Sequence, residues 1–205
     1  MIEDIIRYTP VSSLIFVFTI LTSLYAFYGD GSVFRGLMLH PYSIFRNKRR
    51  YTVFTSAFIH ADYNHLIFNM LSYFFFAFTL EKIVGHWQFA LIYIGGIVLS
   101  DISSIIKNRN NIGYYSLGAS GAVSAVLFSY ILFDPTSKIY LFFIPIGIPA
   151  YLFALLYLGY CMYAAKNQSD NINHDAHFWG ALSGWIITII LFPHIFGYFI
   201  QAVFA

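Results

Sequence analysis

Charged side chains are scarce in this chain: Asp, Glu, Lys and Arg make up 10% of its 205 residues, against about 25% in soluble domains. Hydrophobic residues make up 59%, and the mean hydropathy is +0.69. A soluble fold of this size cannot bury so much apolar surface, whereas a lipid bilayer removes the need to do so. We therefore expect an all-α membrane protein. The net charge of +2 is too small and too scattered to indicate a nucleic-acid partner.

Cysteine is also nearly absent. The single Cys161 lies in an apolar stretch, so no intramolecular disulfide can form. The apolar run near the N-terminus lacks a small-residue cleavage site, and we expect it to be retained as a helix. The sequence has no internal repeat and no second compositional region, which we interpret as a single domain over residues 1–205.

Six segments are candidate transmembrane helices, because a helical crossing needs roughly 20 mostly apolar residues. They cover approximately residues 11–28, 63–80, 87–106, 119–133, 149–165 and 176–192. The fourth is short, which indicates a helix that starts below the membrane surface. Pro145, Gly147 and Pro149 precede the fifth, so its start should be irregular. The longest connection covers residues 29–60, and we expect it to hold structure of its own.

Three clusters of polar side chains interrupt the apolar segments, and such residues indicate function because they are costly inside a membrane. His65 and Asn69 are four residues apart near the start of the second span, so they share one helix face. Ser120 begins the fourth span, and His177 begins the sixth. Spans two, four and six all start on the same side of the membrane. The clusters can therefore meet at one shallow depth that water can reach.

The residue types predict acyl-transfer chemistry. A serine hydroxyl becomes a useful nucleophile when a nearby base takes its proton, and histidine, with a reference pKa of about 6.5, suits that role. Ser120 at a helix N-terminus would place backbone N–H groups beside the developing oxyanion, and His65 and Asn69 can add donors there. The nearest acidic residue is Asp175, which should point elsewhere on the helix. We therefore favour a Ser120–His177 dyad.

Glycines near both predicted dyad residues suggest close packing of the two helices. Gly121 lies in the fourth span, and Gly180 and Gly184 lie in the sixth. Small residues allow helix backbones in membranes to approach closely. A hydrogen bond between Ser120 and His177 requires such an approach.

Taken singly, these residues have simpler explanations, and other functions stay open. A serine in a membrane helix commonly bonds its own backbone. The histidines would also suit a proton relay in a channel or transporter, or haem ligation by His65 and His177. An intramembrane metalloprotease or aspartyl protease is disfavoured. The chain has no His-Glu-x-x-His motif, and neither Asp101 nor Asp134 has a Gly-x-Gly-Asp setting.

From Tyr51 to Gly184 the chain resembles the rhomboid intramembrane serine proteases. The resemblance rests on three motifs that occur in the family's order. They are His60-x4-His65-x3-Asn69 followed by Glu81, then Gly118-Ala-Ser-Gly121, then Ala176-His177-x2-Gly180-x3-Gly184. The three together are specific, whereas any one alone is not.

The resemblance implies a six-helix bundle that acts as a serine endopeptidase. Ser120 would be the nucleophile and His177 the general base, while His65, Asn69 and the Ser120 backbone would form the oxyanion site. The implied substrates are transmembrane segments of other proteins, which would reach the site laterally near spans two and five, under a mobile cap. No cofactor, metal or nucleic acid is expected. The main alternative is a catalytically inactive relative that escorts membrane proteins, disfavoured because both dyad positions are filled.

Two positions depart from the family's pattern. Tyr51-Thr52 stands where a Trp-Arg pair is common in the first loop. Ser124 stands four residues after the predicted nucleophile, where an aromatic residue often supports the catalytic histidine.

The charge distribution and the family resemblance predict opposite orientations in the membrane. Most of the basic residues lie in the loops that precede spans two, four and six, which by the positive-inside rule would place those loops in the cytoplasm. These residues are Arg35, Arg46, Lys48, Arg49, Arg50, Lys107, Arg109 and Lys166. Active sites of the family usually face outward. We expect an outward-facing site in a cell (plasma or inner) membrane.

Overall fold

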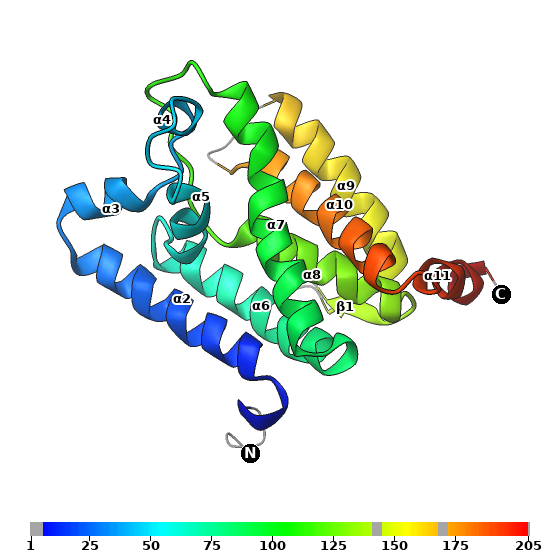
Figure 1. Cartoon of the computed structure of the whole chain (residues 1–205). Coiled ribbons are helices and arrows are strands. Elements are labelled where there is room, and N and C mark those ends of the chain that lie inside the picture. The colour runs from blue at the N-terminus through cyan, green and yellow to red at the C-terminus, as the bar shows by residue number, and fades with distance from the viewer. Residues whose placement is uncertain (1–5, 141–144, 168–171, 205) are drawn as a thin grey trace.

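Six long helices occupy the six segments that the sequence predicts as membrane helices (Figure 1). The computed structural model describes residues 6–140, 145–167 and 172–204. The long helices are α2 (Pro10–Tyr28), α6 (Tyr63–Val84), α7 (His86–Lys107), α8 (Ser120–Phe133), α9 (Ala150–Asn167) and α10 (His174–Leu191), and the shorter α11 (Ile195–Phe204) follows them. The all-α fold class is confirmed.

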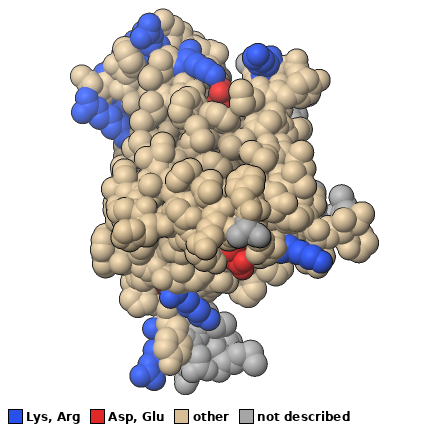
Figure 2. All heavy atoms as spheres, turned by 90° about the vertical axis from the view of Figure 1, so that its right-hand side faces the viewer, with Lys and Arg blue, Asp and Glu red and all other residues tan. Residues whose placement is uncertain are grey.

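Several of these helices have the length and apolar composition of membrane spans. Among the described residues, α2, α6 and α7 are each long and apolar enough to cross a bilayer, and α10 with α11 adds a fourth if this pair, bent by 114°, counts as one span. The lipid-facing character is clearest on α2, where Leu14, Leu21 and Tyr25 are more than half exposed. Figure 2 shows charged side chains at the two ends of one face, with a broad uncharged belt between them. A total of six crossings stays a prediction.

The connection over residues 29–60 holds structure of its own, as predicted. It contains α3 (Gly31–Leu37), α4 (Pro41–Phe45), α5 (Thr52–Thr55) and the 3₁₀ turn η1 (Ser56–Phe58). The Arg49 guanidinium ties it together by donating to the carbonyl oxygens of Arg35 and Gly36, at 2.6 and 2.9 Å. Tyr51 donates its hydroxyl to the Gly36 oxygen at 3.2 Å, and Thr52 bonds the Arg49 carbonyl at 2.7 Å. Arg49 and Tyr51 thus anchor the loop where the family's Trp-Arg pair is missing.

A short antiparallel pair of strands precedes α9. Strand β1 (Lys138–Tyr140) pairs with β2 (Gly147–Pro149), with Ile139 opposite Ile148. The segment that holds Gly147 and Pro149 is therefore not helical, but it is an ordered strand rather than the irregular start that the sequence predicts. Pro149 ends this strand immediately before the helix begins.

Helix α8 lies at the centre of the bundle and packs against α6, α7 and α10. Its contact with α10 is unusually close. A Cβ at Gly180 would overlap the carbonyl oxygen of Gly121, and one at Gly184 would overlap that of Ala125. Because backbone meets backbone at both points, the starts of α8 and α10 are held side by side.

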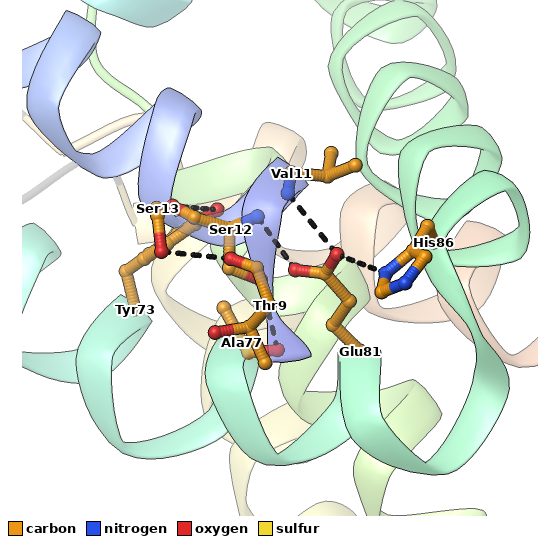
Figure 3. A network of polar contacts seen from close by, with 8 residues as sticks. All are labelled: Thr9, Val11, Ser12, Ser13, Tyr73, Ala77, Glu81 and His86. Carbon is orange, nitrogen blue, oxygen red and sulfur yellow. Dashed lines mark hydrogen bonds and ion pairs between the residues drawn. The ribbon is translucent and has the colours of Figure 1, made fainter. Parts of the chain in front are cut away.

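A buried carboxylate joins α2 to the end of α6 (Figure 3). Glu81 is 1% exposed and accepts the backbone N–H groups of Val11 and Ser12, at 3.1 and 2.6 Å. It also pairs with Nδ1 of His86 at 2.7 Å. A negative charge stabilises a helix N-terminus, whose first N–H groups lack intrahelical acceptors. Tyr73 adds a hydroxyl bond to the Ser12 carbonyl at 3.2 Å, so α2 and α6 are fixed to each other at this end.

Candidate active site

Ser120 is the first residue of α8, and the turn before it depends on Gly118. That glycine has φ +117°, a conformation that side-chain-bearing residues rarely adopt. A Cβ there would also lie 2.7 Å from Cε1 of His65. The Gly118 N–H donates to the Ser56 carbonyl at 2.9 Å. Gly118 thus lets the chain pass directly beside the His65 ring and deliver Ser120 to the helix start, where backbone N–H groups have no intrahelical acceptor.

His60 supports the same turn, a role that the sequence did not reveal. Its ring is fully buried, and burial, together with the neighbouring His65, lowers the pKa of His60 to about 3. The ring is therefore neutral at ordinary pH. Its Nε2 accepts the N–H of Ala119 at 3.4 Å, so Nδ1 carries the proton and donates to the Ser23 hydroxyl at 2.9 Å. His60 thereby connects α2 to the residue just before Ser120.

His65 and Asn69 lie in the first two turns of α6. The Asp62 side chain caps this helix by accepting the His65 N–H at 2.8 Å. One amide hydrogen of Asn69 is donated to the His65 carbonyl at 3.0 Å. An Asn amide has two hydrogens, and the bonds among the described residues use one of them, in a cavity that both side chains line.

His177 lies in the first turn of α10, which a polar cap fixes. The Asn173 side chain accepts the Ala176 N–H at 3.1 Å and donates to the Ser104 hydroxyl of α7 at 2.9 Å. Asp175 is bound by Lys107, with both carboxylate oxygens 2.7 Å from Nζ. This nearby acid is therefore engaged by a lysine of α7.

The ring that supports His177 comes from α9. Tyr157 lies nearly parallel to the imidazole, with an interplanar angle of 13° and centroids 6.4 Å apart. Its hydroxyl is 2.8 Å from the hydroxyl of Ser124, the position where the family often has an aromatic residue. A small polar side chain at 124 leaves room for a ring from another helix and bonds its hydroxyl. The sequence shows the small side chain at position 124 but not its partner Tyr157, because nothing in the sequence shows which face of α9 meets α10.

The four predicted site residues line one open cavity of about 1110 Å³: His65, Asn69, Ser120 and His177. They come from the starts of α6, α8 and α10, as expected from the equal sidedness of these helices. Ala164 and Ala165 near the end of α9 form part of the wall. Ser120 is therefore on the wall of a cavity that several helices share.

Comparisons with known proteins identify the family of this chain. A family model described as the Rhomboid domain matches residues 47–194. The chain is 29% identical over 153 residues to RHOMBOID-like protein 12, mitochondrial, of Arabidopsis thaliana, covering 67% of this chain and 45% of that protein. It is 29% identical over 144 residues to the putative rhomboid protease YdcA of Bacillus subtilis, and the match covers 70% of this chain and 68% of that protein. It is 30% identical over 146 residues to Rhomboid protein 1, mitochondrial, of Saccharomyces cerevisiae, and the match covers 67% of this chain and 42% of that protein.

The chain thus spans less than half the length of the plant and yeast relatives and about two thirds of the Bacillus one. The family model nevertheless covers well over half of this chain, from the first loop to the end of α10. With its polar cavity inside a bundle of apolar helices, this chain belongs to the rhomboid family of membrane proteins.

Proposed function

We propose that the chain is an intramembrane serine endopeptidase that hydrolyses peptide bonds in or near transmembrane segments of other membrane proteins. The observation that carries the proposal is the single cavity lined by Ser120, His177, His65 and Asn69. A nucleophile, a base and two hydrogen-bond donors on one water-accessible wall are the parts that acyl transfer requires.

The proposed reaction uses these groups in two stages. The Ser120 hydroxyl attacks the scissile carbonyl carbon while His177 takes its proton. The tetrahedral oxyanion accepts hydrogen bonds from the Ser120 N–H and from the His65 and Asn69 side chains. As the C–N bond breaks, His177 returns the proton to the leaving amine. Water then attacks the acyl-enzyme with His177 again as base, which releases the second product and restores the serine.

Lateral access between α6 and α9 suits the proposed substrates. Both helices contribute to the cavity wall, α6 through Phe68 and α9 through Ala164 and Ala165. Phe68 is 48% exposed, so its ring lies at the boundary between cavity and outer surface. A transmembrane segment unwound near its end can pass this boundary from the lipid. The mobile cap stays a prediction.

The competing proposal is a catalytically inactive rhomboid that binds and escorts membrane proteins. It would use the same cavity and lateral access but would not need an activated serine. The position of Ser120 and His177 at the starts of two closely packed helices, on the wall of one cavity, favours the enzyme. We also retain the prediction of a cell membrane with an outward-facing site, although the plant and yeast relatives are named mitochondrial. Protease protection of a tag in the loop before α6 tests the orientation.

Labelling with a tagged fluorophosphonate separates the two proposals. We expect the detergent-purified protein to react, and expect Ser120→Ala and His177→Ala to abolish both labelling and cleavage of a model transmembrane substrate. Circular dichroism and thermal unfolding verify that the variants are folded. A folded wild type that takes no label contradicts the enzyme and favours the escort. Labelling that survives His177→Ala contradicts the assigned base.

A further inference from the structure

Next to the proposed base lies a cluster of three groups that metal ions bind. The thiol of Cys161 on α9 and the imidazoles of His174 and His177 on α10 place their ligand atoms within 4.8 Å of one another. Cys161 is fully buried and His174 is 4% exposed, whereas His177 is half-buried and lines the cavity. Sulfur with two imidazole nitrogens is a ligand set that favours Zn²⁺ over Mg²⁺ or Ca²⁺.

The local structure brings the three ligand atoms close to the geometry that zinc requires. His174 and His177 are three residues apart on α10, so their rings project from one face, with centroids 5.9 Å apart. Cys161 reaches this face from α9. Tetrahedral Zn²⁺, with Zn–N of about 2.0–2.1 Å and Zn–S of about 2.3 Å, places its ligand atoms about 3.3–3.6 Å apart. Side-chain movements of about an ångström bring the three ligand atoms from their present separations to these values.

The cavity supplies both a route and a fourth ligand position. His174 and His177 line its wall, so an ion from the aqueous side reaches both imidazoles directly. Three protein ligands leave one tetrahedral position for water, as in zinc sites of enzymes. The Tyr160 ring lies edge-on to His174, with ring centroids 5.4 Å apart.

We propose that Cys161, His174 and His177 form a binding site for one zinc-class divalent cation, and that the bound cation inhibits the enzyme. Ligation releases the Cys161 thiol proton to water. A metal-bound neutral imidazole directs one nitrogen lone pair to the metal and carries hydrogen on the other nitrogen. Whichever nitrogen of His177 binds, none is left to accept the Ser120 proton. The inhibitory half rests on the proposed function, whereas the binding half does not.

Cobalt(II) titration of the purified protein tests the binding half without any activity measurement. Cys161 is the only cysteine, so a thiolate-to-cobalt charge-transfer band must report on this residue. We expect the band to saturate at one equivalent and to be displaced by Zn²⁺. Cys161→Ala abolishes the band, and His174→Asn weakens affinity by at least roughly 100-fold, since even outer-shell partners of a metal contribute 10- to 100-fold. His194→Asn, a change at an exposed histidine near the C-terminal end of α10, is the matched control and keeps the band.

Fluorophosphonate labelling of Ser120 tests the inhibitory half. Wild-type protein should lose labelling in stoichiometric Zn²⁺, keep it in Mg²⁺, and recover it after chelation. Cys161→Ala should label as wild type does without metal and resist Zn²⁺. The absence of a thiolate band at millimolar cobalt overturns the site. A band with unchanged or increased labelling in Zn²⁺ overturns the inhibition, and a wild type that never labels refutes the proposed function while the cobalt result still decides the site.

Discussion

The two helices that flank the proposed base, α8 and α9, are packed very differently. In α8, eleven of fourteen residues are buried, whereas α9 buries only Ala150, Ala154, Cys161 and Ala164 among its eighteen. The proposed nucleophile thus starts a helix enclosed on all sides, while the ring beside His177 comes from a helix with a large exposed surface. A rigid nucleophile favours catalysis, because misplacement by an ångström costs rate. A loosely packed neighbour allows a substrate to pass.

Alanine substitution of glycine should have its largest effect at the α8–α10 contact and almost none on α9. Gly180→Ala places a Cβ against the Gly121 carbonyl, which must separate the helices. Overpacking typically costs about 1–3 kcal/mol, and we expect lost cleavage with a lowered unfolding temperature. The matched control is Gly159→Ala on α9, where a Cβ meets nothing within 4 Å. Equal losses of cleavage and of unfolding temperature in the two variants would contradict the expected difference between the helices.

Asn69→Ala should slow cleavage without unfolding the protein. Asn69 is one of the proposed oxyanion donors, and loss of one such donor typically lowers kcat by about 10²–10³-fold. Its bond to the His65 carbonyl lies within one helix, so we expect only a small change in unfolding temperature. Single-turnover cleavage of a model transmembrane substrate measures the effect. An unchanged kcat contradicts the oxyanion assignment.

Acid should destabilise the α8 side of the site through His60. In the folded protein its pKa is about 3, while in the unfolded chain it is about 6.5, so below pH 6.5 the unfolded state binds the proton first. Stability is then lost as the pH falls from about 6.5 to 3, by up to about 1.4 kcal/mol per pH unit. Thermal unfolding at several pH values measures the slope. His60→Gln should reduce this dependence of stability on pH. A wild type whose unfolding temperature stays constant across this range contradicts the lowered pKa of His60.

The smallest effect is expected on the α9 side. Tyr157→Phe keeps the ring beside His177 but loses the hydrogen bond to Ser124, and a typical bond contributes about 1 kcal/mol. We expect a fewfold lower kcat/KM with little change in unfolding temperature. Ser124→Ala should match it, and the double variant should be no worse than either single one, because both remove the same bond. Additive losses would show that the two side chains act independently.

Much of the fold follows from the sequence because long apolar segments predict where the helices lie. Each of the six expected segments is a helix, with ends within about four residues of those predicted, and the shortness of α8 also follows from local composition. The candidate site could be predicted because its residues lie at the starts of alternate helices. Parity alone places such starts on one side of the membrane, with no knowledge of how the helices pack.

The tertiary structure alone decided which side chains meet across helices. The bond from Glu81 to the start of α2, the support of the Ser120 turn by His60, and the stacking of Tyr157 on His177 join distant parts of the chain. The approach of Cys161 to His174 is of the same kind. Such contacts depend on the rotation of each helix about its axis and on its depth beside its neighbours. Residue composition does not fix these two quantities, because almost every face of such a helix is apolar, and close packing between particular helices selects them.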